Sequence, residues 1–456
     1  MRTFLYIASL SFSLVTGVSS FQANGQSIGN NAQTVVSGDS LSLAQIMQTV
    51  IQSHPSIKEA EEAVAIADAK IGFAKSGYYP NVEANASYSH VGPAPIIPFP
   101  VFDKTIQDNR IMNFQLFPAD NYSGSLNYNQ VLYDFGKTKQ SVGMEKESKT
   151  IAERNANLFK QRLSSMVANT FYSLVFLQEA IKIKDKELQI LKEHLEFVEK
   201  KKATGSATQY ELLSIKVKIS AAENQKVDIV TSQKIQQSAL RSLMGLPNTV
   251  VPIVKQDIAL VLPNINQDSL LNYAYSNRLE MGLSKEKETI TGLQYNLVKS
   301  QNNPVLSLFA SAGGKNGYPI DLAVFKFNYA AGIGLKIPLF DGYRMKYNLA
   351  QTKSAVNNAT YDTEIARRSI TNEVVESEAN RLAAMQKIKQ YELQVAQAEE
   401  AFSLAKVNYS TGAITNLDLL DAENIVSESR LMLLKSRVDY ITSVFRLNIS
   451  LGNKMY

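Results

Sequence analysis

The fold of this chain is decided by residues 136–204, which read GKTKQSVGMEKESKTIAERNANLFKQRLSSMVANTFYSLVFLQEAIKIKDKELQILKEHLEFVEKKKAT. The stretch contains no proline, and Gly143 is its only glycine after Gly136. Apolar residues recur in it at the seven-residue spacing of a coiled coil. One row is Val167, Leu174, Ile181, Leu188 and Leu195, and a second row, interrupted by Lys184, is Leu177, Leu191 and Val198. We therefore expect a helix over 136–203 that is about 100 Å long and has helical neighbours on both sides.

The unit that contains this helix occurs twice in the chain. Three short motifs of the first half recur in the second half at one shared offset of about 207 residues, which indicates an internal duplication. The pairs are Leu132–Gly136 with Leu339–Tyr343, Thr204-Gly205 with Thr411-Gly412, and Leu243–Gly245 with Ser450–Gly452. Pro80 matches Pro304 at a larger offset of about 224, so the first copy carries roughly 17 extra residues between Pro80 and Asp134.

Ahead of each long helix the hydrophobic period changes to two, which is the period of a β-strand. The alternation is clear from Asn81 to Tyr88 and over 328–339, and weaker over 305–312, where Phe309 falls on the polar side. Strands of about ten residues with one apolar side are typical of transmembrane β-barrels. A sheet of a soluble protein, with one face packed on the core and the other exposed to solvent, fits the alternation equally well. The proline-rich stretch 92–100 stops a strand, so we interpret 92–121 as a loop.

Composition excludes several classes of protein. The 456 residues carry 47 Lys and Arg against 42 Asp and Glu, a net charge of +5, without a basic run. The sequence therefore lacks the cluster of basic residues that is typical of nucleic-acid-binding proteins. The absence of cysteine excludes disulfides, thiolate metal sites and cysteine nucleophiles, and the three histidines, His54, His90 and His194, are scattered. We predict a protein that is not an enzyme and that uses no cofactor or metal.

The first 25 residues are predicted to be a signal peptide. Arg2 provides a basic start, residues 3–18 are apolar, and Ala23-Asn24-Gly25 offers small residues for cleavage. A transmembrane helix would need a longer apolar stretch. We expect an exported protein in which any membrane span is made of β-strands.

The mature chain is predicted to consist of two repeats, residues 26–277 and 278–456. The first comprises a helix over 43–77, a β-hairpin over 81–133, the long helix 136–203, a helix over 208–244 and a belt segment over 246–277. The second comprises a helix, a β-hairpin over 305–339, a long helix over 342–411 and a helix over 416–451. Two short helices placed end to end would match the length of one long helix.

The number of strands predicts an oligomer. Each chain supplies four strands, whereas a transmembrane barrel needs at least eight. A homotrimer would give twelve strands. The predicted fold is thus an internally duplicated α+β membrane protein, with long coiled-coil helices that form a tube and a twelve-strand transmembrane barrel shared by three protomers.

The chain resembles the outer membrane efflux protein (TolC) family across essentially its whole mature length. The resemblance rests on the signal peptide, the duplication, the strand-to-helix junctions at Asp134, Gly136, Asp341 and Gly342, and the motif YSTGAITNLDLLDA at 409–422. It implies a homotrimer in the outer-membrane lipid of a Gram-negative bacterium, with an α-barrel tunnel that extends into the periplasm. It also implies two partners, a periplasmic adaptor (membrane fusion) protein and an inner-membrane transporter.

The turns at the ends of the long helices carry the candidate functional residues. Glycine tolerates the left-handed conformation that ends helices, which accounts for Gly205 and Gly412. The family's adaptor contacts would fall on these tip turns, at Thr204, Gly205, Thr411 and Gly412. Its constriction aspartates map onto Asp418 and Asp421, and its gating tyrosine maps onto Tyr409.

Two interpretations of the acidic residues remain open. Glu211 is the repeat equivalent of Asp418, and both stand in the first turn of a helix, where acids favour the helix dipole anyway. In a trimer these two residues and Asp421 would instead form a ring of up to nine carboxylates at a pore mouth, which would favour cations.

The function predicted is a passive exit duct of a tripartite efflux or type I secretion system. The chain has no phosphate-binding loop or other nucleotide motif, so the transporter would supply the energy. The alternative is an exported periplasmic coiled-coil adaptor or scaffold with a soluble β-domain.

Overall fold

The structure is a computed structural model that describes residues 40–93, 95–103, 108–255, 267–319 and 321–454. The predicted signal peptide lies outside the described residues, as does part of the predicted belt segment, residues 256–266. Among the described helices, none has a stretch long and apolar enough to cross a membrane.

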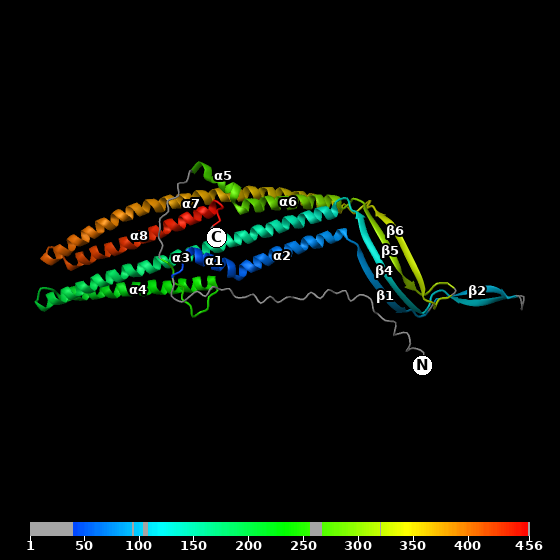
Figure 1. Ribbon diagram of the computed structural model, residues 1–456, viewed down its shortest axis with the longest axis horizontal. Coiled ribbons are helices and arrows are strands. Elements are labelled where there is room, and N and C mark those ends of the chain that lie inside the picture. The colour runs from blue at the N-terminus through cyan, green and yellow to red at the C-terminus, as the bar shows by residue number, and fades with distance from the viewer. Residues whose placement is uncertain (1–39, 94, 104–107, 256–266, 320, 455–456) are drawn as a thin grey trace, which may run out of the picture. The chain divides into compact units, whose positions relative to one another are not determined.

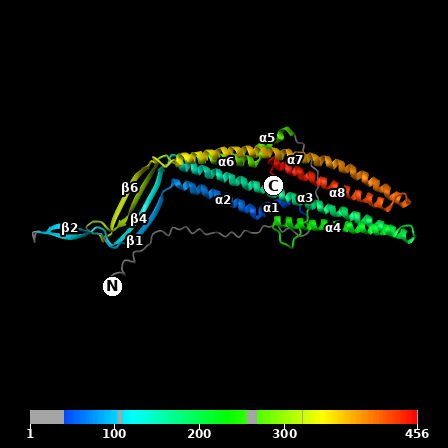
Figure 2. The ribbon, with the colours of Figure 1, turned by 180° about the vertical axis from the view of Figure 1, so that it is seen from behind.

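Two long, unbroken helices organise the chain, α3 (Lys137–Ala203) and α7 (Arg344–Thr411). Helices α2 (Pro55–Lys75) and α4 (Gln209–Met244) pack against α3 and follow one another along it (Figures 1 and 2). Helices α6 (Leu279–Ser300) and α8 (Asn416–Ser450) pack against α7 in the same way and also contact α3. The helices therefore form four parallel columns, with α7 at one edge and α2 and α4 at the other.

The helix predicted over 43–77 is divided in the structure, and the prediction of a single helix was wrong. Helix α1 (Leu43–Ser53) ends at His54, whose backbone is extended (φ −66°, ψ 127°), and α2 begins at Pro55. Proline disfavours the helical conformation of the residue before it. The same break recurs between α5 (Gln267–Asn277) and α6 at Arg278 (φ −65°, ψ 128°), which is the position that matches His54 in the second repeat.

Four antiparallel strands form one sheet in the order β1-β4-β5-β6. The strands are β1 (Asn81–His90), β4 (Asp120–Tyr133), β5 (Val305–Lys315) and β6 (Lys326–Lys336). Their register aligns apolar residues in rows across the sheet: Leu126 lies opposite Ala84 and Ala312, and Ala312 lies opposite Tyr329. The neighbouring row is polar, since Asn127 lies opposite Glu83 and Ser311. One face of the sheet is therefore apolar and the other is polar.

Phe309 is the exception on the polar face. It lies opposite Asn129 and Gly332, and a Cβ added at Gly332 would lie 2.8 Å from the Phe309 ring. The ring therefore covers the backbone of Gly332, and a side chain at this position would displace the ring.

The interpretation of 92–121 as a loop was wrong for most of its length. Strands β2 (Ile96–Asp103) and β3 (Asp108–Gln115) form a second, two-stranded antiparallel sheet there. Proline is tolerated in a strand where its missing N–H faces away from the partner. Pro98 and Pro100 are two residues apart and so lie on the same side of β2, opposite Asn113 and Ile111. This added hairpin accounts for the extra residues of the first repeat.

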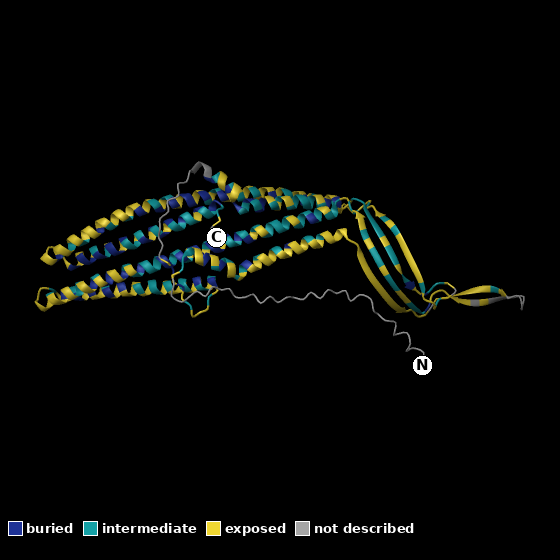
Figure 3. Cartoon of the chain, viewed as in Figure 1, coloured by how far each residue is buried: buried dark blue, intermediate teal, exposed yellow. Residues whose placement is uncertain are grey.

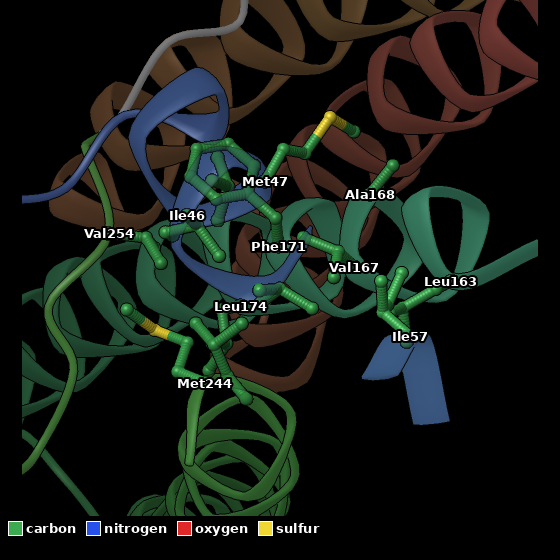
Figure 4. Close-up of a cluster of buried hydrophobic side chains, with 13 residues drawn as sticks. Ile46, Met47, Ile57, Leu163, Val167, Ala168, Phe171, Leu174, Met244 and Val254 are labelled. Atoms are coloured by element: carbon green, nitrogen blue, oxygen red, sulfur yellow. The ribbon is translucent and has the colours of Figure 1, made fainter. Parts of the chain in front are cut away.

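The largest cluster of buried side chains lies where α1, α2 and the end of α4 meet the middle of α3 (Figure 4). Val167, Leu174 and Phe171 of α3 are at most 1 % exposed, and Ile46 of α1 and Leu240 of α4 pack with them. Figure 3 shows that buried residues gather on the helices, whereas the strands are mostly exposed or half-buried.

Candidate functional site: the helix tips

Both long helices end in the same type of cap. At the end of α3, the Gly205 N–H donates to the Lys202 carbonyl (3.0 Å), and the Ser206 N–H donates to the Lys201 carbonyl (2.8 Å). At the end of α7, the Gly412 N–H donates to the Tyr409 carbonyl (3.2 Å), and the Ala413 N–H donates to the Asn408 carbonyl (2.8 Å). This is the Schellman motif.

The motif requires a positive φ, and φ is +78° at Gly205 and +81° at Gly412. Glycine is needed at both positions because other residues are strained there.

The returning helices also begin alike. The Thr208 hydroxyl accepts a hydrogen bond from the Glu211 N–H (3.1 Å), and the Thr415 hydroxyl accepts one from the Asp418 N–H (3.3 Å). In α8 the bond is reciprocal, because the Thr415 N–H donates to an Asp418 carboxylate oxygen (2.9 Å). These bonds satisfy backbone donors that have no partner within the helix. Glu211 and Asp418 thus both serve the helix start.

Tyr409 joins the two helical hairpins, α3–α4 and α7–α8, at their tips. Its phenol donates a hydrogen bond to Glu211 on α4 (3.2 Å), although the two residues are 198 positions apart. The ring packs edge-on against His194 of α3, with centroids 5.1 Å apart, and the Lys201 ammonium lies 4.7 Å from its centre. Burial, together with the negative charge of Glu211, raises the pKa of Tyr409 to about 12. The phenol therefore stays a hydrogen-bond donor at physiological pH.

A second set of hydrogen bonds lies beside Tyr409. Nε2 of His194 and Oδ1 of Asn416 are 2.7 Å apart, and Nδ2 of Asn416 donates to the Ser214 hydroxyl (3.0 Å). These residues belong to α3, α8 and α4 and were not predicted from the sequence. The sequence showed His194 only as a scattered histidine, and Asn416 only as part of the motif at 409–422 and as the start of a predicted helix.

The other predicted acids are more exposed. The Asp418 carboxylate is held by Thr415, and the hydrogen bonds from the hydroxyl and backbone N–H of Thr415 lower its pKa. The Asp421 side chain is 61 % exposed, and its nearest cation is Lys218 of α4, 4.0 Å away. The structure thus brings Glu211 and Tyr409 together and leaves Asp418 and Asp421 at the surface of α8. Within the described part of the chain, no cluster of three His, Cys, Asp or Glu residues is placed to hold a metal ion.

A buried group of charged side chains lies between α3 and α8, further from the tips. Lys184 and Glu187 of α3 form an ion pair of 2.6 Å whose side chains are 6 % and 7 % exposed, and the Ser427 hydroxyl of α8 also bonds to Glu187. Glu423 of α8 lies nearby, and burial together with repulsion from Glu187 raises its pKa to about 7. Lys184, which interrupts the apolar row in the sequence, is therefore buried in a polar contact between two helices.

The predicted strand-to-helix junctions lie at the other end of the long helices. Asp134 accepts hydrogen bonds from the N–H groups of Gly136 (3.0 Å) and Thr138 (2.7 Å), and Asp341 accepts one from the Met345 N–H (2.8 Å). Gly136 and Gly342 have positive φ angles of +91° and +70°. Each aspartate thus caps the long helix that follows its strand.

The sequence matches the model of a known protein family over most of its length. The family described as "Outer membrane efflux protein" matches residues 46–246 and 276–453, which include both repeats.

Two relatives in the sequence comparison are similar over most of their length. The chain is 22 % identical over 345 residues to the alkaline protease secretion protein AprF of Pseudomonas aeruginosa, covering 73 % of this chain and 70 % of AprF. It is 21 % identical over 339 residues to the outer membrane protein TolC of Vibrio cholerae, covering 73 % of this chain and 77 % of TolC.

Among solved structures, the chain is similar to the outer membrane protein VceC of Vibrio cholerae. The TM-score is 0.75 with 20 % sequence identity, and the match covers 91 % of this chain and 97 % of VceC. The two proteins therefore share a fold.

Proposed function

The chain belongs to the outer membrane efflux protein family, and from this membership we infer that it is the outer-membrane exit duct of an efflux or type I secretion system. The observation that carries the inference is the family match to both repeats. The duct is a passive conduit from the periplasm to the exterior. The interpretation as an exit duct fits the relatives better than the interpretation as a coiled-coil adaptor or scaffold, since the family consists of channel proteins.

The protein lies in the outer membrane of a Gram-negative bacterium and extends into the periplasm. AprF is named for the secretion of a protease, and the family is named for efflux. Both processes are driven from the inner membrane, so a periplasmic adaptor and an inner-membrane transporter are the implied partners.

We propose that three copies complete the membrane-spanning part. Strands β1 and β6 form the two edges of the described four-stranded sheet, and an open edge facing lipid would leave polar backbone groups without partners. Pairing of β6 with β1 of the next copy, repeated three times, would give twelve strands. Tyr329 and Ile333 on the apolar face, which are 81 % and 67 % exposed, would then face lipid.

The helices offer a matching interface. The two edge columns carry large apolar side chains that one copy leaves exposed, and such patches mark interaction surfaces. On α4 they include Val217, Val227 and Ile235, and on α7 they include Tyr347, Tyr361, Ile365 and Leu404. Contact between α7 of one copy and α2 and α4 of the next would bury both sets and close an α-barrel of twelve columns.

We propose that the helix tips form the gate of this tunnel. In each copy Tyr409 ties the α7–α8 hairpin to Glu211 of the α3–α4 hairpin. Threefold symmetry would place Glu211, Asp418 and Asp421 of all three copies around the mouth. Exposed carboxylates gathered in this way favour cations.

The turns themselves are proposed as the contact for the adaptor. Thr204, Gly205, Thr411 and Gly412 are all exposed. Beside them stand Tyr210 and Leu417, which occupy equivalent positions in the two repeats and are 76 % and 55 % exposed. Large apolar side chains at both tips provide a surface for a protein partner.

The proposed function is tested by purification in detergent, mass measurement and planar-bilayer recording. We expect a trimer that requires detergent and that conducts ions after insertion. A monodisperse monomer that is stable without detergent would contradict the proposal and would favour the scaffold alternative.

A further inference from the structure

The hydrogen bonds around Asn416 connect three of the four helices at the tip. Asn416, at the start of α8, uses its amide nitrogen as donor to Ser214 of α4 and its amide oxygen as acceptor for His194 of α3. Because an amide oxygen can only accept, Nε2 of His194 must carry the hydrogen in this arrangement. The Ser214 hydroxyl in turn donates to the Glu211 backbone carbonyl (2.8 Å).

These groups are shielded from water. Asn416 is 6 % exposed, and His194 is half-buried against the rings of Tyr409 and Phe197. A buried amide that loses its partners without gaining water is destabilised. The two hairpins therefore cannot separate at the tip unless the bonds of Asn416 to His194 and Ser214 break and these groups become hydrated.

We propose that His194, Asn416 and Ser214 form a second link between the hairpins, beside the Tyr409–Glu211 bond, which must break when the tip opens and which makes opening sensitive to pH. The proposal rests on the channel function proposed above. His194 and Asn416 act in it as positioning residues for the gate.

The surroundings of His194 determine the direction of the pH effect. The titratable groups that face the imidazole are Lys201 of α3, Glu211 of α4, and Lys406 and Tyr409 of α7. Burial is the largest influence and lowers the pKa of His194, and the two lysines act in the same direction. The bond to Asn416 and the charge of Glu211 act against it.

Opening would expose the imidazole to water and return its pKa to the ordinary value of about 6.5. The joined form therefore binds protons less readily than the open form. Acidification through pH 6.5 and below consequently favours the open form, and the link holds best at neutral pH.

The experiment is single-channel recording of the purified trimer in planar bilayers at pH 7.5 and 5.5. Asn416→Ala removes both bonds of the link, to His194 and to Ser214. We expect an open probability at pH 7.5 that is higher by at least roughly two- to tenfold, the range for loss of a single hydrogen bond. His194→Gln keeps an N–H donor but cannot titrate. Whatever its open probability at pH 7.5, we expect this variant to lose the increase at pH 5.5.

Three variants serve as matched controls. His54→Gln and His90→Gln replace the other two histidines of the chain. Glu423→Gln removes the buried carboxyl that also titrates near pH 7. All three should retain the increase in opening at pH 5.5.

Two results would overturn the inference: wild-type opening that does not change with pH, or His194→Gln that keeps the full response. Normal opening of Asn416→Ala at pH 7.5 would contradict the link itself. If Asn416→Ala does not assemble, the pH response of the His194→Gln channel still tests the proposal. A wild-type trimer that does not conduct would instead contradict the channel function.

Discussion

The phenol of Tyr409 on α7 donates a hydrogen bond to the carboxylate of Glu211 on α4, 3.2 Å away. Glu211 is in turn tied to the start of α4 through its backbone bond to Thr208. The contact thus connects the last turn of α7 to the first turn of α4. The tip interface also contains a cluster of buried apolar side chains, and hydrogen bonds such as this one and those of Asn416 fix the orientation in which the two hairpins pack.

Tyr409→Phe should loosen the tip without disturbing its packing. The ring contacts with His194 and Phe197 remain, but the bond to the Glu211 carboxylate is lost, which weakens the joined form by about 1.5–3 kcal/mol, the range for a hydrogen bond to a charged group. We expect more frequent channel opening in planar bilayers and an unchanged trimer. The pKa of Tyr409 is about 12, so its phenol does not titrate between pH 5.5 and 7.5. Opening of the Tyr409→Phe channel should therefore keep the pH dependence of the wild type. Wild-type gating in Tyr409→Phe would show that the hydrogen bond has no part in closure.

Asp418→Asn combined with Asp421→Asn should abolish block by trivalent cations added on the periplasmic side. Hard cations prefer carboxylate oxygens, and the asparagine oxygen at 418 can still accept the bonds from Thr415 that hold the helix start. Single-channel current with and without the cation measures the effect. Asp439→Asn, an exposed change further along α8, is the control and should leave block intact. Persistent block in the double variant would mean that these acids serve only the helix ends.

Glu423→Gln should stabilise the protein at alkaline pH only. The folded-state pKa of about 7 exceeds the ordinary value of 4.5, so the ionised carboxylate is disfavoured in the fold. Stability therefore falls as pH rises from 4.5 to 7, and the penalty is complete above pH 7. Glutamine removes it, which should add up to about 3 kcal/mol at pH 8.5 and nothing near pH 4.

Thermal unfolding followed by circular dichroism at the two pH values tests this prediction. The exposed Glu428→Gln, one helical turn and a half further along α8, should change the midpoint at neither pH. An equal shift of Glu423→Gln at both pH values would indicate a packing effect instead of an effect of charge.

Gly412→Ala should destabilise the tip of α7. At φ +81° an alanine is strained by about 1–2 kcal/mol, and the Schellman bonds depend on that conformation. Gly72→Ala is the opposite case, because Gly72 lies inside α2 with no atom within 4 Å of an added Cβ. It should gain about 0.5–1 kcal/mol. Unfolding midpoints of the two variants should move in opposite directions, and a shift of the same sign in both would contradict the cap assignment.

Local patterns accounted for many of the elements. The seven-residue rows predicted the extent of α3 because side chains seven positions apart lie on one face of a helix. Gly205 and Gly412 indicated the ends of α3 and α7 because the left-handed conformation selects glycine. The pattern rules were less successful where two of them competed. Pro55 divided a helix that the apolar pattern continued, and Pro98 and Pro100 were tolerated in β2 because of which side their missing N–H faces.

The sequence by itself determined the duplication, the long helices, the alternating strands and the caps, since each depends on residues a few positions apart or on direct repetition. Only the tertiary structure decided which side chains meet at the tips. Tyr409 and Glu211 are 198 positions apart, and His194 and Asn416 are 222 apart. Lys184, Glu187 and Glu423 likewise share a site only because α8 packs on α3. Such contacts depend on how two whole hairpins lie against each other, because shared burial and hydrogen bonding follow from that packing and leave no periodic signal in the chain.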